Sequence, residues 1–292
     1  MDTGIPAGNI GVDQRPTQEG PLRPHTMNIV VCVKYVPDAT ADRRFEADNT
    51  VDRVDVDGLL SELDEYAVEQ ALQIKEKRAE EDIEVTALTV GPQKAADAVR
   101  KALQMGADKG VHVVDEAIAG SDAIATSLVL AEAIKKANGG TVPDLVVCGL
   151  ASTDASMSVV PAMLAERLGV PQVTLAAVVE TQGDQVRIKR DTDVATEVVG
   201  GAMPLVLSVT DQSGEARYPS FKGIMAAKKK PLETWSVGDL GVDAGQLGLS
   251  AAWTQVEETA ARPPRTAGEI VKDEDGSGAK ALADFLASKK FI

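Results

Sequence analysis

The chain has 292 residues, of which 44% are apolar and only 3% aromatic, and its formal net charge at pH 7 is −15. This length can bury a sizeable core, in one large domain or two small ones. A surface this acidic argues against a nucleic-acid partner, because phosphate binding needs a basic surface. No apolar run approaches the roughly 18–20 residues that cross a bilayer, so we expect no membrane insertion.

The cysteine pattern bears on the compartment. Cys32 and Cys148 each lie in an apolar, strand-like run and form no CxxC pair. Neither a zinc site nor a secreted disulfide framework is therefore indicated. We expect two buried thiols in a reducing compartment, which predicts a cytoplasmic protein.

The first 26 residues differ in composition and pattern from the rest of the chain. Prolines stand at positions 6, 16, 21 and 24, and no amphipathic period is present. The stretch lacks both the apolar core of a secretory signal and the Arg/Ser-rich helix of a transit peptide. We expect residues 1–26 to be a disordered extension, or to result from translation at an upstream start codon, and we expect the fold to begin at Met27.

Strand-like and helix-like patterns alternate in the first half of the chain. Apolar runs predict strands at 29–33, 84–90, 111–114 and 145–148, and helical periodicity predicts helices at 61–77, 94–105, 121–136 and 159–168. Such alternation indicates right-handed crossovers and a parallel sheet covered by helices on both faces. A core of Ala, Val, Leu and Ile suits such a sheet.

The pattern changes after residue 171. Strands are predicted at 173–181, 185–190, 195–200 and 205–210, with a hairpin turn at Gly183-Asp184. They should attach an antiparallel extension to the parallel sheet, within one α/β domain that covers residues 27–234. Gly, Ser and Pro become frequent in 235–292, and an amphipathic helix is predicted at 279–292. This C-terminal arm is expected to pack on a partner subunit, because so short a helix is marginal alone.

A nucleotide site is predicted at the carboxyl edge of the sheet, where open parallel sheets bind ligands. Four segments reach this edge: Cys32–Lys34, Ser61–Asp64, Val90–Gly91 and the loop 149–160. In the loop, Gly149 permits close backbone approach, and four hydroxyls precede a helix, which favours a phosphate site. Asp154 would repel phosphate unless it turned outward, where it could cap the helix or meet a ribose hydroxyl.

Other interpretations of this loop stay open. Its serines and Asp154 are also typical of ordinary helix capping. The chain contains neither GxGxxG nor GxxxxGK[ST], so a classical dinucleotide fold and a P-loop NTPase are not supported. His25 lies in the N-terminal tail and His112 in a strand, and no nucleophile–base arrangement can be assembled. The pattern indicates a site that holds a nucleotide without cleaving it, and therefore no enzyme.

The segment 216–230 reads ARYPSFKGIMAAKKK. Its apolar residues Phe221, Ile224 and Met225 lie between Arg217 and a run of three lysines. We expect a long loop that projects from a sheet edge and docks a partner, because apolar anchors supply affinity and charges steer association. A merely solvated loop is the alternative.

Several motifs occur in an order that resembles one family. They are VCVKYVPD at 31–38, DEYAVEQAL at 64–72, GPQKAADAVRKALQMGAD at 91–108, GLASTDASMSVVPAMLAERLGVP at 149–171, the segment 216–230, GDLGVD at 238–243 and PPRTAG at 263–268. Together they are similar to the beta subunit of bacterial electron-transfer flavoproteins. The resemblance implies an open, mostly parallel, Rossmann-like sheet of the adenine nucleotide alpha hydrolase-like kind.

The resemblance also implies function. It implies pairing with an alpha subunit that holds most of the FAD, and a structural AMP in this chain. The expected AMP contacts are Cys32, Ser61, Glu62, Leu63, Asp64, Val90, Gly149, Leu150, Ala151, Ser152, Thr153, Asp154, Ala155, Ser156, Met157, Ser158, Val159 and Val160. A recognition loop is implied at 209–231, with partner contacts at Arg217, Tyr218, Phe221, Ile224 and Met225.

The implied activity is electron carriage from acyl-CoA or similar dehydrogenases to a membrane quinone oxidoreductase, as in fatty acid β-oxidation. In such a protein the flavin performs the redox chemistry. A free-standing adenine-nucleotide-binding module of the universal-stress type is the main alternative. A hydrolytic or adenylating enzyme on the same scaffold is a weaker one.

Overall fold

The computed structural model describes residues 26–41, 43–260, 263–264, 268, 270–273 and 276–292. The expected disordered extension thus lies, apart from Thr26, outside the described residues. The chain divides into one compact unit that ends at Glu257 and a second from Glu258 to Ile292. The second unit contains helix α7 (Gly278–Ser288), which is shorter than the helix predicted at 279–292.

The first unit is built on a seven-stranded sheet in the order β12-β5-β4-β1-β6-β11-β7, in which the recorded pairings are parallel. This confirms the predicted α/β fold. Its strands are β1 (Met27–Cys32), β4 (Ile83–Val90), β5 (Lys109–Val113), β6 (Leu145–Gly149), β7 (Gln172–Ala176), β11 (Leu205–Val209) and β12 (Leu232–Trp235).

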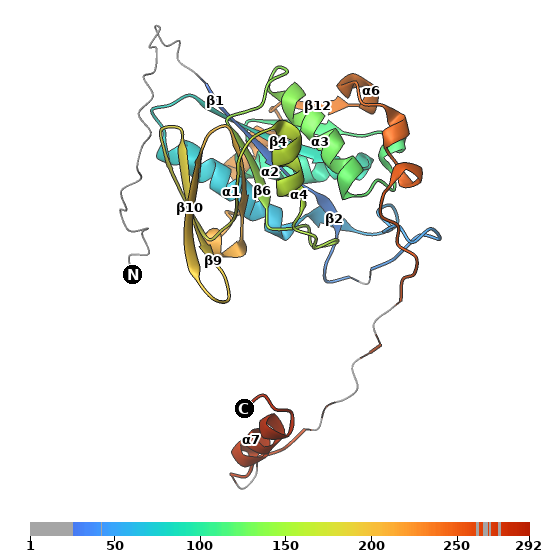
Figure 1. Ribbon diagram of the computed structural model, residues 1–292, viewed down its shortest axis with the longest axis vertical. Coiled ribbons are helices and arrows are strands. Elements are labelled where there is room, and N and C mark those ends of the chain that lie inside the picture. The colour runs from blue at the N-terminus through green and yellow to red at the C-terminus, as the bar shows by residue number, and fades with distance from the viewer. Residues whose placement is uncertain (1–25, 42, 261–262, 265–267, 269, 274–275) are drawn as a thin grey trace. The chain divides into compact units, whose positions relative to one another are not determined.

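Helices cover both faces of this sheet (Figure 1). Alternate side chains of a strand point to opposite faces, so Ile29 and Val31 pack with helices α1 (Glu62–Lys77) and α2 (Ala96–Met105). Val30 packs on the other face, with helices α3 (Ala123–Ala137) and α4 (Val160–Leu168). The predicted helices are therefore confirmed to within a few residues at their ends.

The predicted single strand at 173–181 is wrong. It is split into β7, which belongs to the parallel sheet, and β8 (Val178–Gln182), which pairs in a separate antiparallel sheet with β9 (Gln185–Asp191) and β10 (Thr196–Ala202). The break is at Ala177 and follows an irregularity in β7 at Leu175, whose φ of 63° is left-handed and whose amide donates to Ser208 Oγ at 2.9 Å. A residue in this conformation interrupts the regular extended backbone, so the run does not form one continuous strand. The predicted hairpin turn at Gly183-Asp184 is confirmed, since it joins β8 and β9.

Several short elements were not predicted. A two-stranded sheet joins β2 (Tyr35–Pro37) and β3 (Gly58–Leu60), and β12 adds an edge strand beside β5. Strands of three or four residues give too little alternation to be read from sequence. The remaining elements are α5 (Phe221–Ala227), α6 (Val237–Leu240), η1 (Gln93–Ala95), η2 (Glu116–Ile118), η3 (Asp211–Ser213), η4 (Ala244–Gln246) and η5 (Leu249–Ala251). Among the described residues, no helix has the length and apolarity to span a membrane.

A matched pair of valines tests the assignment of the core. Val206 of β11 is fully buried, whereas Val194, in the turn between β9 and β10, is 94% exposed. We expect Val206→Ala to lower the free energy of unfolding by about 2 kcal/mol, because it deletes two buried carbons and leaves a cavity. Val194→Ala should change it by less than about 0.5 kcal/mol. Chemical denaturation of the two variants would contradict the assignment if they proved equally stable.

Candidate functional site

The strand order reverses at the boundary between β1 and β6. From β1 the chain proceeds to β4 and β5 on one side, and it then crosses to β6 on the other side. In doubly wound sheets, ligands bind at the carboxyl ends of the strands at such a switch point. The switch-point site is defined here as the end of β1, the first turn of α1, the end of β6 and the loop 150–159.

The buried carboxyl group of Asp64 joins three of these parts. It lies in the first turn of α1, and its Oδ2 accepts a hydrogen bond from the Lys34 amide at 2.9 Å. The amide of Gly149, at the end of β6, also donates to it. Burial raises the pKa of Asp64 to about 7, although these hydrogen bonds and the Lys34 charge oppose the shift.

Gly149 is required by the same contact. A Cβ at this position would lie 2.5 Å from Asp64 Oδ1 and 2.6 Å from the main-chain oxygen of Leu63. The expected close approach of backbone at Gly149 is thus present, and the group that approaches is the first turn of α1. Any larger residue would push α1 away from β6.

Asp154 does not turn outward, which was the condition under which it would not repel a phosphate. Its side chain is only 1% exposed and forms ion pairs with Lys34, at 2.9 Å from Nζ to Oδ1, and with the Arg53 guanidinium. A buried carboxylate is tolerated when it is paired in this way. Although burial acts to raise it, these two cations hold the pKa of Asp154 well below its usual range. Burial lowers the pKa of Lys34.

Further hydrogen bonds fix the loop around Asp154. The Arg43 guanidinium donates to the main-chain oxygens of Asp154, at 2.7 Å, and of Thr153. The Thr153 amide lies 3.4 Å from Ser61 Oγ, and Lys34 Nζ lies 3.3 Å from Ser152 Oγ. Three separate segments therefore hold residues 152–154 in place.

Sequence reasoning missed the role of the three cations. Lys34 falls within the predicted strand-end segment 32–34, so its place at this edge of the sheet was predicted. Its ion pair with Asp154 was not. Arg43 and Arg53 lie in a charged stretch with no periodic pattern, and nothing local connects them to a loop a hundred residues later. Only the folded chain brings them to Asp154.

Ordinary side-chain capping does not explain the serines of the loop. Helix α4 has Val159 as its N-cap residue, and no side chain caps it. Ser156 and Ser158 have left-handed φ angles of 52° and 57°, and both are exposed. Their conformation lets the loop turn sharply into α4, whose N-terminus carries a partial positive charge.

Cys32 and Val90 lie at the same edge of the sheet. Cys32 ends β1 and shares a hydrogen bond with Cys148 of β6. That bond, together with burial, raises the pKa of the Cys148 thiol. Val90 ends β4, the neighbour of β1. The two thiols are free and buried, as the sequence predicts.

The prediction that the segment 216–230 is a loop projecting from a sheet edge is wrong. The segment contains helix α5, and the preceding strand β11 is an interior strand between β6 and β7. From β11 the chain crosses outside α1 and α2 to reach β12 on the opposite edge. Gln70 of α1 donates to the Ser213 oxygen at 2.7 Å, and α5 packs on α2.

The large apolar side chains of this segment face outward. Tyr218 is 91% exposed and Phe221 is 80% exposed, and Ile224 and Met225 are also exposed. We call these four residues the exposed apolar surface. Arg217, in contrast, is paired inside the chain with Glu69 and Glu76 of α1.

The chain is similar to known proteins over nearly its whole length. A family model described as "Electron transfer flavoprotein domain" matches residues 48–240. The electron transfer flavoprotein subunit beta of Mycobacterium tuberculosis (strain ATCC 25618 / H37Rv) is 43% identical over 268 residues, covering 91% of this chain and 99% of the relative. The corresponding subunit of Megasphaera elsdenii is 33% identical over 266 residues, covering 90% of this chain and 97% of the relative.

The chain belongs to the electron transfer flavoprotein beta subunit family. The resemblance seen in the sequence motifs is therefore confirmed. Both the loop 149–160 and helix α5 fall within the matched residues.

The buried carboxyl group of Asp64 predicts a pH dependence. Its pKa of about 7 in the folded chain lies above the value of about 3.9 in an unfolded chain. The folded state therefore binds the extra proton, and this contribution to stability is lost as pH rises from about 4 to about 7. Asp64→Asn should remove it.

We expect denaturation curves between pH 5 and pH 8 to show a flatter dependence in Asp64→Asn than in the unaltered chain. The difference in slope should approach about 1.4 kcal/mol per pH unit at most. Identical slopes would show that Asp64 is ionised throughout this range.

Proposed function

We propose that the chain is the beta subunit of a heterodimeric electron-transfer flavoprotein, and that it binds AMP at the switch-point site. The observation that carries the proposal is the alignment with proteins named as beta subunits over 97–99% of their length. A free-standing nucleotide module of the universal-stress type leaves the segment 216–230 without a role.

The residues of the switch-point site suit an adenylate. Lys34 and Arg53 place two cations beside the single carboxylate of Asp154, while a pKa of about 7 leaves Asp64 only partly ionised at neutral pH. The local charge therefore favours an anion, in contrast to the acidic chain as a whole. The main chain and hydroxyls of the loop, next to the start of α4, would hold the phosphate. Asp154 would act by fixing the loop and not by touching the phosphate.

The flavin would supply the redox chemistry when bound, and the alpha subunit would hold most of it. The chain itself would act as a carrier subunit with no catalytic residues, in the cytoplasm. Its proposed donors are acyl-CoA or similar dehydrogenases, as in fatty acid β-oxidation, and its proposed acceptor is a membrane quinone oxidoreductase. The C-terminal arm would pack on the alpha subunit.

The exposed apolar surface would dock the dehydrogenase. A helix usually buries its larger apolar residues, and a contiguous exposed apolar patch marks an interaction site. Lys222, Lys228 and Lys229 flank it, and within the described residues no carboxylate is recorded as pairing with them. The matching partner surface would be an apolar pocket with an acidic rim.

Co-expression tests the assignment of the subunit. Expressed with the alpha subunit, the chain should purify as a yellow heterodimer, and alone it should be colourless. Denaturing the heterodimer should release AMP, identified by its mass, in addition to FAD. A colourless, self-sufficient chain that turns over ATP would instead support the alternatives.

Replacing Phe221 tests the docking surface. Phe221→Ala should weaken the binding of a donor dehydrogenase by about 1–3 kcal/mol, because a buried aromatic anchor is lost at the interface. Its effect on unfolding should be small, since the side chain is 80% exposed. The measurement is the KM for the heterodimer in reduction assays with a panel of acyl-CoA dehydrogenases. Val194→Ala is the control, and an unaltered KM for every donor would exclude the role.

A further inference from the structure

The exposed apolar surface depends on a helix that cannot be stable alone. Helix α5 has seven residues, fewer than an isolated helix needs in water. It turns small residues inward: Gly223 lies against the main-chain oxygen of Gln104 in α2, 2.5 Å from where a Cβ would be, and Ala227 packs on the core. Small side chains bury little area, so other contacts must hold the helix in position.

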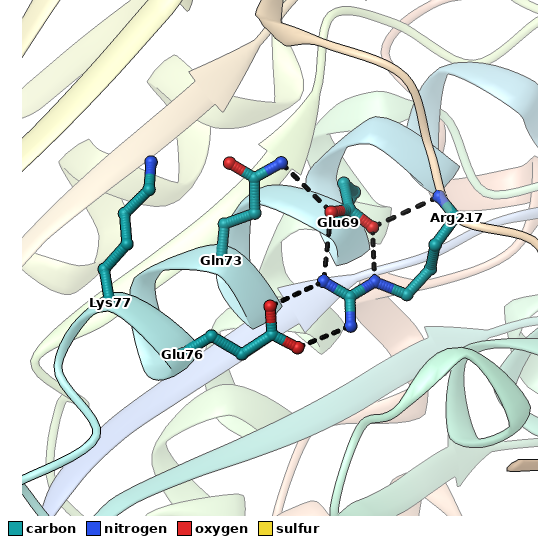
Figure 2. Close-up of a pocket in the computed structure, with 5 residues that line it drawn as sticks. All are labelled: Glu69, Gln73, Glu76, Lys77 and Arg217. Atoms are coloured by element: carbon teal, nitrogen blue, oxygen red, sulfur yellow. Dashed lines mark hydrogen bonds and ion pairs between the residues drawn. The ribbon is translucent and has the colours of Figure 1, made fainter.

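Arg217 provides such a contact at the N-terminal end. Its Nε lies 2.6 Å from Glu69 Oε2, and its Nη1 lies 2.6 Å from Glu76 Oε1. Nη2 donates to both carboxylates at 3.0 Å, and the Arg217 amide donates to Glu69 at 3.2 Å. Figure 2 shows the planar guanidinium between the two carboxylates of α1, while Lys77 extends away without a contact to them. We call these three residues the Arg217 clamp.

The electrostatics of the clamp favour a fixed geometry. Glu69 is buried, and Gln73 donates to it at 3.0 Å in addition to Arg217. Although burial acts to raise the pKa of Glu69, hydrogen bonds from Arg217 and Gln73 hold it below its usual value. Bonds from Arg217 also lower the pKa of Glu76. Both carboxylates are therefore ionised at neutral pH, and bidentate pairs with arginine fix orientation as well as distance.

Lys230 provides the contact at the C-terminal end. Its Nζ donates to the main-chain oxygens of Leu103 at 3.0 Å and of Ala107 at 2.6 Å. These oxygens lie in the last turn of α2 and just beyond it, where carbonyl groups lack helical partners and a cation is favoured. The segment is thus tied to α1 at one end and to α2 at the other.

We propose that Arg217 is a positioning residue, which holds α5 against the domain so that the exposed apolar surface is already formed when a redox partner arrives. This inference rests on the proposed docking function and adds the residue that makes the surface rigid. A preformed surface binds more tightly, because less conformational entropy is lost on association. Arg217 would thus act through α5 and not by touching the partner, since its donors are engaged by Glu69 and Glu76.

Hydrogen exchange in the heterodimer measures the positioning directly. Arg217→Gln should raise the exchange rate of amides in residues 218–229 by about tenfold or more, because charge-assisted bonds worth more than about 1.4 kcal/mol are lost. Arg217→Lys should show a smaller rise, since one ammonium group cannot span both carboxylates in the same way. Glu76→Gln keeps the ion pair between Arg217 and Glu69, so it should raise the exchange rate less than Arg217→Gln does. It provides a milder variant in case Arg217→Gln does not fold.

Reduction kinetics measure the consequence. Arg217→Gln should raise the KM for the heterodimer about tenfold in assays with a donor acyl-CoA dehydrogenase. Its kcat should change less than about twofold, because the flavin site is untouched. The matched control is Arg190→Gln in β9. It also removes an arginine that ties elements together, through the Thr174 oxygen of β7 and Glu197 of β10, but it lies outside the segment 216–230. It should change neither quantity.

The outcomes separate the two proposals. Unchanged exchange in Arg217→Gln overturns the positioning role, and a raised KM with unchanged exchange would mean that Arg217 touches the partner itself. Raised exchange with an unchanged KM, in an assay where Phe221→Ala raises KM, also overturns it. If Phe221→Ala leaves KM unaltered with every donor, the proposed docking function is overturned. The proposed role of Arg217 in docking is then overturned as well.

Discussion

The contact between the first turn of α1 and the end of β6 is the constraint on which both proposed functional regions depend. Gly149 has no side chain, so the carboxyl group of Asp64 can reach the main chain of two strands at once. This seats α1 across the switch point of the sheet. Once α1 is placed, its N-terminal end borders the proposed adenylate site, and its outer side presents Glu69 and Glu76 to Arg217.

Two buried carboxylates organise the polar parts of the structure in the same manner. Asp154 binds Lys34 and Arg53, and Glu69 binds Arg217. In each case the cation comes from a segment distant in sequence, and leaving the carboxylate unpaired would be strongly unfavourable. The pairs therefore specify where each loop lies, so that three of the 30 lysines and arginines of this acidic chain fix its two proposed binding regions.

Local sequence patterns were sufficient to predict the parallel sheet, but not the course of the chain after residue 171. Aliphatic runs such as 145–148 form strands wherever they are buried, and the helical periods between them leave only crossover connections. The prediction of one strand at 173–181 was wrong because the backbone is left-handed at Leu175, which Ser208 of β11 holds, and the strand breaks at Ala177. The helix in the segment 216–230 was not predicted because its inward residues are Gly223 and Ala227. These small residues give no periodic pattern of large apolar side chains facing the core.

The sequence by itself determined the α/β fold, the segments that meet at the carboxyl edge of the sheet, and the family, because these depend on local periodicity and on contiguous motifs. Tertiary structure decided that Asp154 points inward, that Arg43 and Arg53 hold its loop, and that Arg217 binds α1 instead of facing outward. The physical reason is that an ion pair between distant segments forms only after the backbone has brought them together. Nothing in the order of residues along the chain records which charges will meet.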